Sequence, residues 1–325
     1  MPNLETTFAG LKLKNPIIVG SSGLTNSVDK IKEISQKGAG AVVLKSLFEE
    51  QIIHDVNSTI KHGTYPGADD YIAEYIKSNN VNTYLNLIKE AKAKTDIPVI
   101  ASINCQNSTK WITFAKDIES AGADALEVNV YFLPIDKNKP SSEYEQTYFD
   151  LLKSLKENTK IPLIFKLGNN FTNLTYLTNR LNANGISAIT LFNRFYEPDI
   201  DVDNLKLTAA EIFSHPSESR KVIRWLALLT DKVKGLEISA STGVHSKETA
   251  IKYLLAGATT VQLCSVIYKN SVSTISEIID GISKWMESKK FEKISDFRGM
   301  MSYKQISDPT IYERAQFIKH FSNFE

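Results

Sequence analysis

The stretch LEISASTGVHSKETAIKYLLAGATTVQLCS, residues 236–265, decides the fold. Two short apolar runs, LEISAS at 236–241 and TVQLCS at 260–265, flank a helical pattern that ends at Gly257. Each run is nearly continuously apolar rather than alternating, as expected of a parallel strand buried on both faces. Glycine is the usual residue just beyond the C-terminus of a helix. The stretch therefore predicts a strand–helix–strand unit with parallel strands.

The same unit recurs along the chain. Further apolar runs, each followed by an amphipathic helical pattern, lie at 17–22, 41–46, 98–103, 125–130, 162–167 and 188–193. Eight such units predict an α/β protein with a (β/α)8 TIM barrel, for which about 250 residues is typical. An open doubly wound sheet is the alternative, and the count and spacing of the runs disfavour it.

The remaining residues are assigned to loops and to a tail. Residues 47–80 form a long connection after the second strand and 194–217 another after the sixth, and loops of that length are usually functional or mobile. No linker marks a second domain, so we expect one domain over 1–325. The tail, 291–325, holds two short helical patterns that we expect to pack on the barrel, either covering its base or contacting another subunit.

Composition limits the class of partner. The chain of 325 residues has 38 Lys plus Arg and 37 Asp plus Glu, a net charge of +1. No overall field draws it to nucleic acid or to an anionic membrane, so a small molecule is the expected partner. Two cysteines, Cys105 and Cys264, are too few for a disulfide framework, which fits a reducing cytoplasm. No leader pattern and no run of about 18 apolar residues is present, so we expect a cytoplasmic protein that does not span a membrane.

The residues that close the apolar runs are unusually polar. In a TIM barrel the active site lies at the C-terminal ends of the strands, so these residues are candidates for function. They are Ser21, Ser22, Lys45, Ser46, Ser102, Asn104, Asn129, Lys166, Asn193, Ser241, Thr242, Cys264 and Ser265. One lysine or asparagine at a strand end is most often a solvated cap, but two of each at four strand ends favour a binding site.

Lys45 and Lys166 each follow an apolar run, which places an ammonium group at the barrel mouth beside a dry core. Such a charge needs an anionic or strongly polar partner. One interpretation is contact with an electron-rich heterocycle, because a nearby positive charge stabilises the ring when it is reduced to an anion. The other is an ion pair with Glu49, Glu50 or Glu127, and the sequence leaves both open.

The loops after the seventh and eighth runs predict a phosphate site. Backbone N–H groups in these two loops form the recurrent phosphate site of TIM barrels, and here the loops begin at Ser241 and at Cys264. An ordinary turn with Ser246 as helix N-cap is the alternative. Both can hold together, because a cap uses the side chain and a phosphate uses main-chain donors. No spacing among the five histidines suggests a metal site.

Motifs along the chain resemble those of a known family. They are LKLKNPIIVGSSG (11–23), AVVLKS (41–46), AGADALEVNV (121–130), IPLIFKL (161–167), AITLFN (188–193) and STGV (241–244) with AGATTVQLCS (256–265). In this order they resemble the dihydroorotate dehydrogenase family of FMN-dependent barrels over nearly the whole barrel. NVYFLP (129–134), LFNRFYEPDID (191–201) and RGMMSY (298–303) resemble a divergent, dihydroorotate dehydrogenase-like branch.

The resemblance implies an N-terminal hairpin, an FMN cofactor and oxidation of a CH–CH bond, that of dihydroorotate to orotate in pyrimidine biosynthesis. It implies ring contacts from Ser21, Ser22, Lys45, Asn104, Asn129 and Lys166. It implies phosphate contacts from Thr242, Gly243, Cys264 and Ser265. Asn129 and Asn193 would face the substrate, and a homodimer is expected by analogy alone.

Three departures from the family pattern concern the substrate. Soluble members use a cysteine to remove a proton from the substrate, and the same offset here gives Phe132, which has no ionisable group. The family's asparagine-rich substrate loop is replaced by HGTYPGADDYIAEY (62–75). Arg194 stands where a small hydroxyl residue is usual, and it could grip a carboxylate or pair with Glu197 or Asp199. Tyr131 and Asp136 are either replacement bases or plain surface residues.

The leading hypothesis is an FMN-dependent oxidoreductase whose substrate is small and planar or anionic, with dihydroorotate as one candidate. Its catalytic residues would be Lys45, Asn129, Tyr131, Lys166, Asn193 and Arg194. A flavin-free barrel that acts on a phosphorylated substrate, with Lys166 forming a Schiff base, is the first alternative. A non-catalytic FMN-binding protein is the second.

Overall fold

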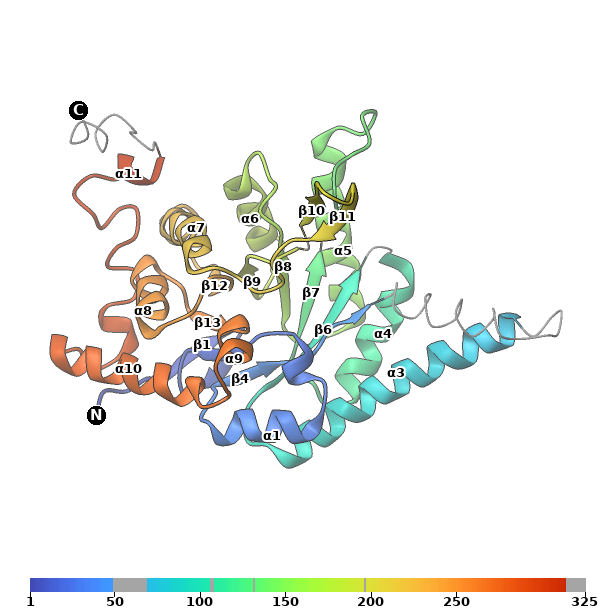
Figure 1. Ribbon diagram of the computed structural model, residues 1–325, viewed down its shortest axis with the longest axis horizontal. Coiled ribbons are helices and arrows are strands. Elements are labelled where there is room, and N and C mark those ends of the chain that lie inside the picture. Colours follow the sequence, from blue (N-terminus) through green and yellow to red (C-terminus); the bar gives the residue numbers. More distant parts are fainter. Residues whose placement is uncertain (49–68, 106–107, 131, 196, 314–325) are drawn as a thin grey trace.

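The computed structural model describes residues 1–48, 69–105, 108–130, 132–195 and 197–313 (Figure 1). Eight parallel strands within them form a closed sheet: β3 (Ile17–Val19), β4 (Ala41–Val43), β6 (Val99–Cys105), β7 (Ala125–Val130), β8 (Leu163–Leu167), β9 (Ala188–Leu191), β12 (Glu237–Ala240) and β13 (Thr260–Leu263). β3 pairs with β4 and β13, and β4 also pairs with β6, which closes the ring. A short strand, β5 (Leu47–Phe48), pairs beside β6. The predicted TIM barrel is confirmed.

The predicted helices surround the barrel (Figure 1). They are α1 (Val28–Gln36), α3 (Asp69–Lys94), α4 (Ser108–Ser120), α5 (Ser141–Asn158), α6 (Leu174–Ala183), α7 (Ser219–Lys232), α8 (Lys247–Ala256) and α10 (Thr274–Lys289), with the short α9 (Ser265–Lys269) and α11 (Thr310–Glu313). Three 3-10 turns cover Gly23–Thr25, Pro216–Glu218 and Ile294–Asp296. In α7 the buried Val222, Leu226 and Leu229 recur every three or four residues, which turns one face to the barrel.

An N-terminal hairpin, β1 (Thr6–Phe8) with β2 (Leu11–Leu13), closes one end of the barrel, as predicted. Phe8 and Leu13 are buried against Ile18, Ile164 and other side chains of the lower barrel interior. At the hairpin turn, the Ala9 backbone N–H donates to the Glu237 carboxylate at the start of β12 (2.5 Å). Because this hairpin closes the N-terminal end, the cavity-bearing mouth lies at the C-terminal ends of the strands.

Both predicted long connections contain regular structure. After the sixth barrel strand, residues 194–217 include an antiparallel hairpin, β10 (Pro198–Asp201) with β11 (Lys206–Ala209), at the end of the barrel toward which β7 points (Figure 1). After the second barrel strand, residues 69–80 belong to α3, so the predicted loop to residue 80 is too long. This segment contains no proline or glycine to interrupt a helix. Residues 49–68 lie outside the described part of the chain.

The described part of the tail packs against the outer helices α7 and α8. Gly299 and Met301 donate backbone hydrogen bonds to the carbonyls of Leu254 and Leu255 in α8, and Tyr303 donates to Ala227 in α7. Residues 314–325 lie outside the described part. Among the described helices, none is both long and apolar enough to cross a membrane.

Candidate active site

Strand alternation builds a polar layer above an apolar one inside the barrel. The lower interior positions of neighbouring strands are Ile100, Ala125, Ile164 and Ala188. Successive side chains of a strand point to opposite faces, so the next inward position lies two residues further on. Those positions are Ser102, Glu127, Lys166 and Thr190, all buried. The barrel interior therefore turns polar as it approaches the mouth.

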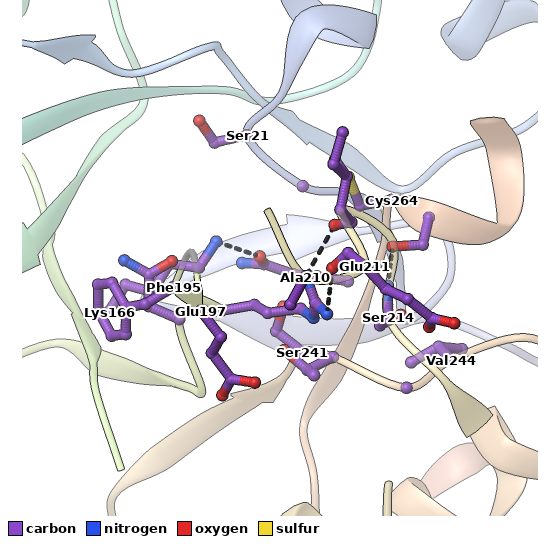
Figure 2. Close-up of a pocket in the computed structure, with 18 residues that line it drawn as sticks. Ser21, Lys166, Phe195, Glu197, Ala210, Glu211, Ser214, Ser241, Val244 and Cys264 are labelled. Carbon is purple, nitrogen blue, oxygen red and sulfur yellow. Dashed lines mark hydrogen bonds between the residues drawn. The ribbon is translucent and has the colours of Figure 1, made fainter. Parts of the chain in front are cut away.

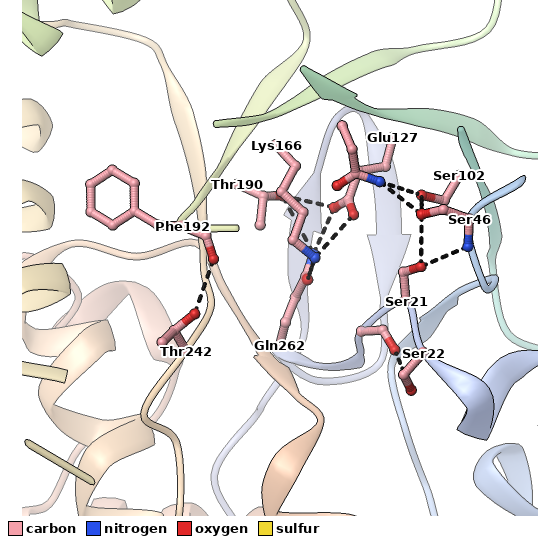
Figure 3. A network of polar contacts seen from close by, with 12 residues as sticks. Ser21, Ser22, Ser46, Ser102, Glu127, Lys166, Thr190, Phe192, Thr242 and Gln262 are labelled. Carbon is pink, nitrogen blue, oxygen red and sulfur yellow. Dashed lines mark hydrogen bonds and ion pairs between the residues drawn. The ribbon is translucent and has the colours of Figure 1, made fainter. Parts of the chain in front are cut away.

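A buried ion pair lies at the centre of this layer (Figure 3). The Lys166 ammonium nitrogen lies 3.4 Å from Glu127 Oε1 and 3.3 Å from the Gln262 amide oxygen. Gln262 Nε2 and Thr190 Oγ1 donate to Glu127 Oε2 at 2.8 and 2.9 Å. The Glu127 side chain is 0% exposed, so its charge depends on these partners. One of the ion pairs considered from the sequence, Lys166 with Glu127, is thus present.

A second cluster joins four strand ends through hydroxyl groups (Figure 3). Ser21 Oγ lies 3.0 Å from Ser46 Oγ, which lies 2.8 Å from Ser102 Oγ. The Asn129 side-chain nitrogen donates to Ser46 Oγ at 2.8 Å and to Ser102 Oγ at 3.0 Å. Asn129 is therefore held in the wall of the barrel, and Asn104 lies opposite it in the strand register.

A cavity of about 330 Å³ opens at the mouth, next to both clusters (Figure 2). Its lining includes many of the predicted residues: Ser21, Lys166, Asn193, Arg194, Ser241, Thr242, Gly243, Cys264 and Ser265. A neighbouring cavity of about 750 Å³ shares Asn193, Arg194 and Thr242 and reaches Arg220 and Lys221 on α7. Volumes of this size are usual for small-molecule sites. The sequence analysis missed two polar members of this region, Gln262 and Thr190, although the same two-residue alternation marks both.

The predicted phosphate turn has an unusual backbone. Thr242 and Gly243 have φ angles of 79° and 74°, in the left-handed region. A Cβ at Gly243 would lie 2.6 Å from the Ser219 backbone nitrogen, so a side chain there would collide. Thr242 is held by hydrogen bonds from its hydroxyl to the Phe192 carbonyl (3.0 Å) and from the Tyr253 hydroxyl to its own carbonyl (2.5 Å). The turn is therefore fixed with its backbone against the cavity. Ser246 stands at the N-cap of α8 without a side-chain capping bond.

Arg194 hydrogen-bonds to the segment that forms one wall of the cavity. Its guanidinium donates to the carbonyl oxygens of Glu211 and Ile212, both at 2.7 Å, and to the Glu218 carboxylate at 3.2 Å. Glu211 and Ile212 themselves line the cavity. The partner carboxylate is thus Glu218 rather than Glu197 or Asp199. With these partners, Arg194 shapes the site instead of offering a free guanidinium to a substrate carboxylate.

Other predicted residues lie beside the cavity or away from it. Lys45 lines a different cavity, of about 550 Å³, together with Asn26 and Tyr84. The Ser22 hydroxyl accepts the Leu24 backbone N–H at 3.2 Å and so begins the 3-10 turn. Tyr131 falls outside the described residues. The structure thus brings the Lys166 and Thr242 regions together but not Lys45.

Phe132 is turned toward an aromatic cluster. Its ring meets Tyr148 of α5 edge to face, with centroids 5.7 Å apart, and Tyr148 meets Phe171 in the same way at 5.5 Å. These three side chains line a separate pocket of about 310 Å³. Asp136 is exposed, and its carboxylate accepts the Asn138 backbone N–H at 2.9 Å. Neither residue places a base beside Lys166.

Two further ionisable groups near the mouth favour their neutral forms. Burial raises the pKa of the Cys264 thiol, although a hydrogen bond with Ser22 and the charge of Lys166 oppose the shift. Burial and the charge of Lys269 lower the pKa of His245, whose Nε2 lies 3.0 Å from the Ser214 hydroxyl. No cluster of three or more His, Cys, Asp or Glu that could hold a metal occurs among the described residues.

A closed parallel barrel with a polar cavity at its C-terminal mouth is the arrangement of TIM-barrel enzymes. The family model described as dihydroorotate dehydrogenase matches residues 3–286, and the chain therefore belongs to the dihydroorotate dehydrogenase family. This confirms the resemblance seen in the motifs.

Curated relatives named "Dihydroorotate dehydrogenase B (NAD(+)), catalytic subunit" cover nearly the same length. The protein of Thermoplasma volcanium is 27% identical over 315 residues, which are 92% of this chain and 99% of the relative. That of Caldicellulosiruptor bescii is 27% identical over 311 residues, with the same coverage of 92% and 99%. That of Pyrococcus horikoshii is 26% identical, covering 91% of this chain and 97% of its own.

Proposed function

We propose that the protein is an FMN-dependent oxidoreductase. FMN would bind at the barrel mouth with its ring beside Lys166 and Ser21 and its phosphate at the turn of Thr242 and Gly243. The observation that carries the proposal is a cavity of about 330 Å³ that is lined both by a buried ammonium group and by a glycine turn. When bound, FMN accepts hydride from a substrate, and the positive charge of Lys166 would stabilise the negative charge that the ring gains.

The residues present fit such a group. The lining supplies a cation, the side-chain amides of Asn193 and Gln262 and the hydroxyl of Ser21 for the polar edge of a ring. At Gly20 an added Cβ would lie only 3.1 Å from Gln262 Oε1, so a larger residue would crowd the floor of the cavity. The neighbouring cavity, which shares Asn193, gives room for a substrate next to the ring.

We propose a small substrate that is planar or anionic. Dihydroorotate is one candidate, which would place the protein in pyrimidine biosynthesis, because the curated relatives carry that activity in their names. Phe132 argues for a different proton step, since its ring packs on Tyr148 and has no ionisable group. A reaction that needs only hydride transfer, or that gives its proton to water, fits this site better.

The visible absorption spectrum of the purified protein tests the proposal. Flavin bands are expected, in the protein as purified or after FMN is added. Dihydroorotate is then added without oxygen. Prompt bleaching would assign dihydroorotate as substrate, while persistent bands would keep the cofactor and exclude dihydroorotate. A protein that stays colourless with excess FMN would overturn the proposal and leave the Schiff-base alternative at Lys166.

A further inference from the structure

The hydroxyls of Ser21, Ser46 and Ser102 form a chain of hydrogen bonds that ends at the cavity. Ser102 is 0% exposed and lies at the inner end of this hydroxyl chain, whereas Ser21 lines the cavity. The spacings are 2.8 Å from Ser102 to Ser46 and 3.0 Å from Ser46 to Ser21. The groups around this hydroxyl chain determine which hydroxyl donates in each hydrogen bond (Figure 3).

The orientation of the Asn129 side-chain amide shows which groups donate to the hydroxyl chain. Its Nδ2 lies 3.4 Å from the Ile103 carbonyl oxygen, which can only accept a hydrogen bond. The nitrogen, and not the oxygen, of the amide therefore faces this group. The same nitrogen donates to Ser46 Oγ and Ser102 Oγ. Both serine oxygens thus accept from Asn129.

The buried end of the hydroxyl chain sets its direction. Among the described residues, the only acceptor near the Ser102 hydroxyl is Ser46 Oγ. If Ser46 donated to Ser102, the Ser102 hydrogen would be buried without an acceptor, which is unfavourable. Ser102 therefore donates to Ser46. With Asn129 and Ser102 both donating to it, Ser46 has filled its two acceptor positions and donates to Ser21.

At Ser21 the acceptor positions are filled as well. Its oxygen receives the Ser46 backbone N–H at 2.9 Å and the Ser46 hydroxyl at 3.0 Å. Among the described residues no further acceptor is bonded to Ser21, so its hydrogen points into the cavity that Ser21 lines. We infer that Ser21 is a hydrogen-bond donor of fixed direction, and that the group bound over it presents an acceptor, such as a ring carbonyl oxygen or an unprotonated ring nitrogen.

Ser46 and Ser102 are accordingly positioning residues, since they act on the ligand through Ser21. For FMN as the ligand, the inference rests on the proposed function. Removing the buried Ser102 hydroxyl opens one acceptor position on Ser46. The Ser21 hydrogen can then turn toward Ser46 and is no longer directed to the ligand alone. The loss should equal about one ordinary hydrogen bond, a threefold to tenfold weaker binding.

The experiment is a double-mutant cycle on FMN affinity, measured by quenching of flavin fluorescence in flavin-stripped protein. Ser21→Ala and Ser102→Ala should each weaken binding about threefold to tenfold, and the double variant no further than Ser21→Ala alone. Ser239→Ala is the matched control. Ser239 is also 0% exposed on a barrel strand, and its hydroxyl has no partner among the described residues. The control should bind FMN like the wild type.

The inference would be overturned if the double variant lost as much FMN affinity as the product of the two single fold-losses. It would also be overturned if Ser102→Ala bound FMN as tightly as the Ser239→Ala control. Neutron diffraction of the deuterated wild-type protein reads the same direction without a variant or a flavin. A Ser21 deuterium aimed into the cavity supports the inference, and one aimed at Ser46 overturns it. A wild-type protein that binds no FMN would instead remove the proposed function, and the neutron map would still decide the direction.

Discussion

The hydroxyl of Tyr84, on α3, holds both backbone polar groups of Ser102, on β6. It accepts the Ser102 N–H at 2.7 Å and donates to the Ser102 carbonyl at 2.9 Å. Tyr84 is buried, and burial raises the pKa of its phenol well above the ordinary value of 10.0, with the negative charge of Glu127 adding to the shift. A helix outside the barrel thus supplies the hydrogen-bond partner for the backbone N–H and carbonyl of the strand position that carries the inner serine.

Replacing Tyr84 with phenylalanine should destabilise the protein by about 1–3 kcal/mol, because the Ser102 N–H and carbonyl lose their partner in a buried place. Urea unfolding measures the change. Tyr176→Phe is the control, since Tyr176 is 47% exposed and a change there should stay within about 0.5 kcal/mol. Equal unfolding midpoints for the two variants would contradict the prediction.

Glu127→Gln should destabilise the protein by about 3–5 kcal/mol, because it leaves the Lys166 ammonium group buried without its carboxylate. Adding Lys166→Met to the same chain removes the unpaired charge and should recover a large part of the loss. Denaturant unfolding of the two single variants and the double variant gives the coupling directly. If the two single losses simply add, the pair does not stabilise the fold in the way that the geometry indicates.

Arg194→Met should loosen the cavity wall. The segment after β11 loses two carbonyl hydrogen bonds and one ion pair that Arg194 now supplies. Hydrogen exchange of the backbone amides at 210–214 should become about tenfold faster, the effect of losing roughly 1.4 kcal/mol of local stability. Arg180→Met, on the exposed face of α6, is the matched control. Unchanged exchange at 210–214 would show that this wall is held by other contacts.

Phe132→Cys should not create dihydroorotate oxidation. A general base contributes roughly 10² to 10⁴ fold, but this side chain points at Tyr148 and not into the cavity beside Lys166. The rate of flavin bleaching by dihydroorotate should therefore stay within about tenfold of the wild type. A gain of a hundredfold or more would mean that the loop can bring residue 132 over the ring.

Stability should fall below about pH 6.5 in a way that depends on His245. Burial and Lys269 lower the pKa of His245 from its ordinary value of 6.5, so the unfolded chain takes up a proton more readily than the folded one. The stabilisation that His245 contributes is complete above pH 6.5. It is lost as the pH falls from 6.5 toward the lower pKa that His245 has in the folded protein.

His245→Asn keeps a polar partner for Ser214 and removes the titration. Urea midpoints at pH 5.5 and 7.5 should differ less in this variant than in the wild type. His215→Asn, at an exposed position, should keep the wild-type difference. The same difference in all three proteins would rule out His245 as the source.

The barrel could be predicted from sequence because a strand buried on both faces must be apolar nearly throughout. The side chains of β7 and β8 satisfy this rule, so their runs stand out, and glycine marks the end of α8. The start of α3 could not be located, because 69–80 mixes polar and apolar residues without a helical stripe. The β10–β11 hairpin was missed for a related reason, since its strands are exposed on both faces.

The site was predicted in part. Residues at strand ends were found one strand at a time, which suffices for Lys166, Asn193 and Thr242 because each follows its own strand into the mouth. Partners across the barrel need the register between strands, and sequence alone does not give it. That is why Gln262 as the partner of Lys166, and the joining of Ser21 to Ser102, came only from the structure.

The hairpin of residues 6–13 seals the end of the barrel that faces away from the cavity. A sensor surface coupled through the first residues of the chain would therefore hold every molecule with its mouth toward the solution. Flavin and substrate exchange could then be followed on the immobilised protein without the support blocking the entrance.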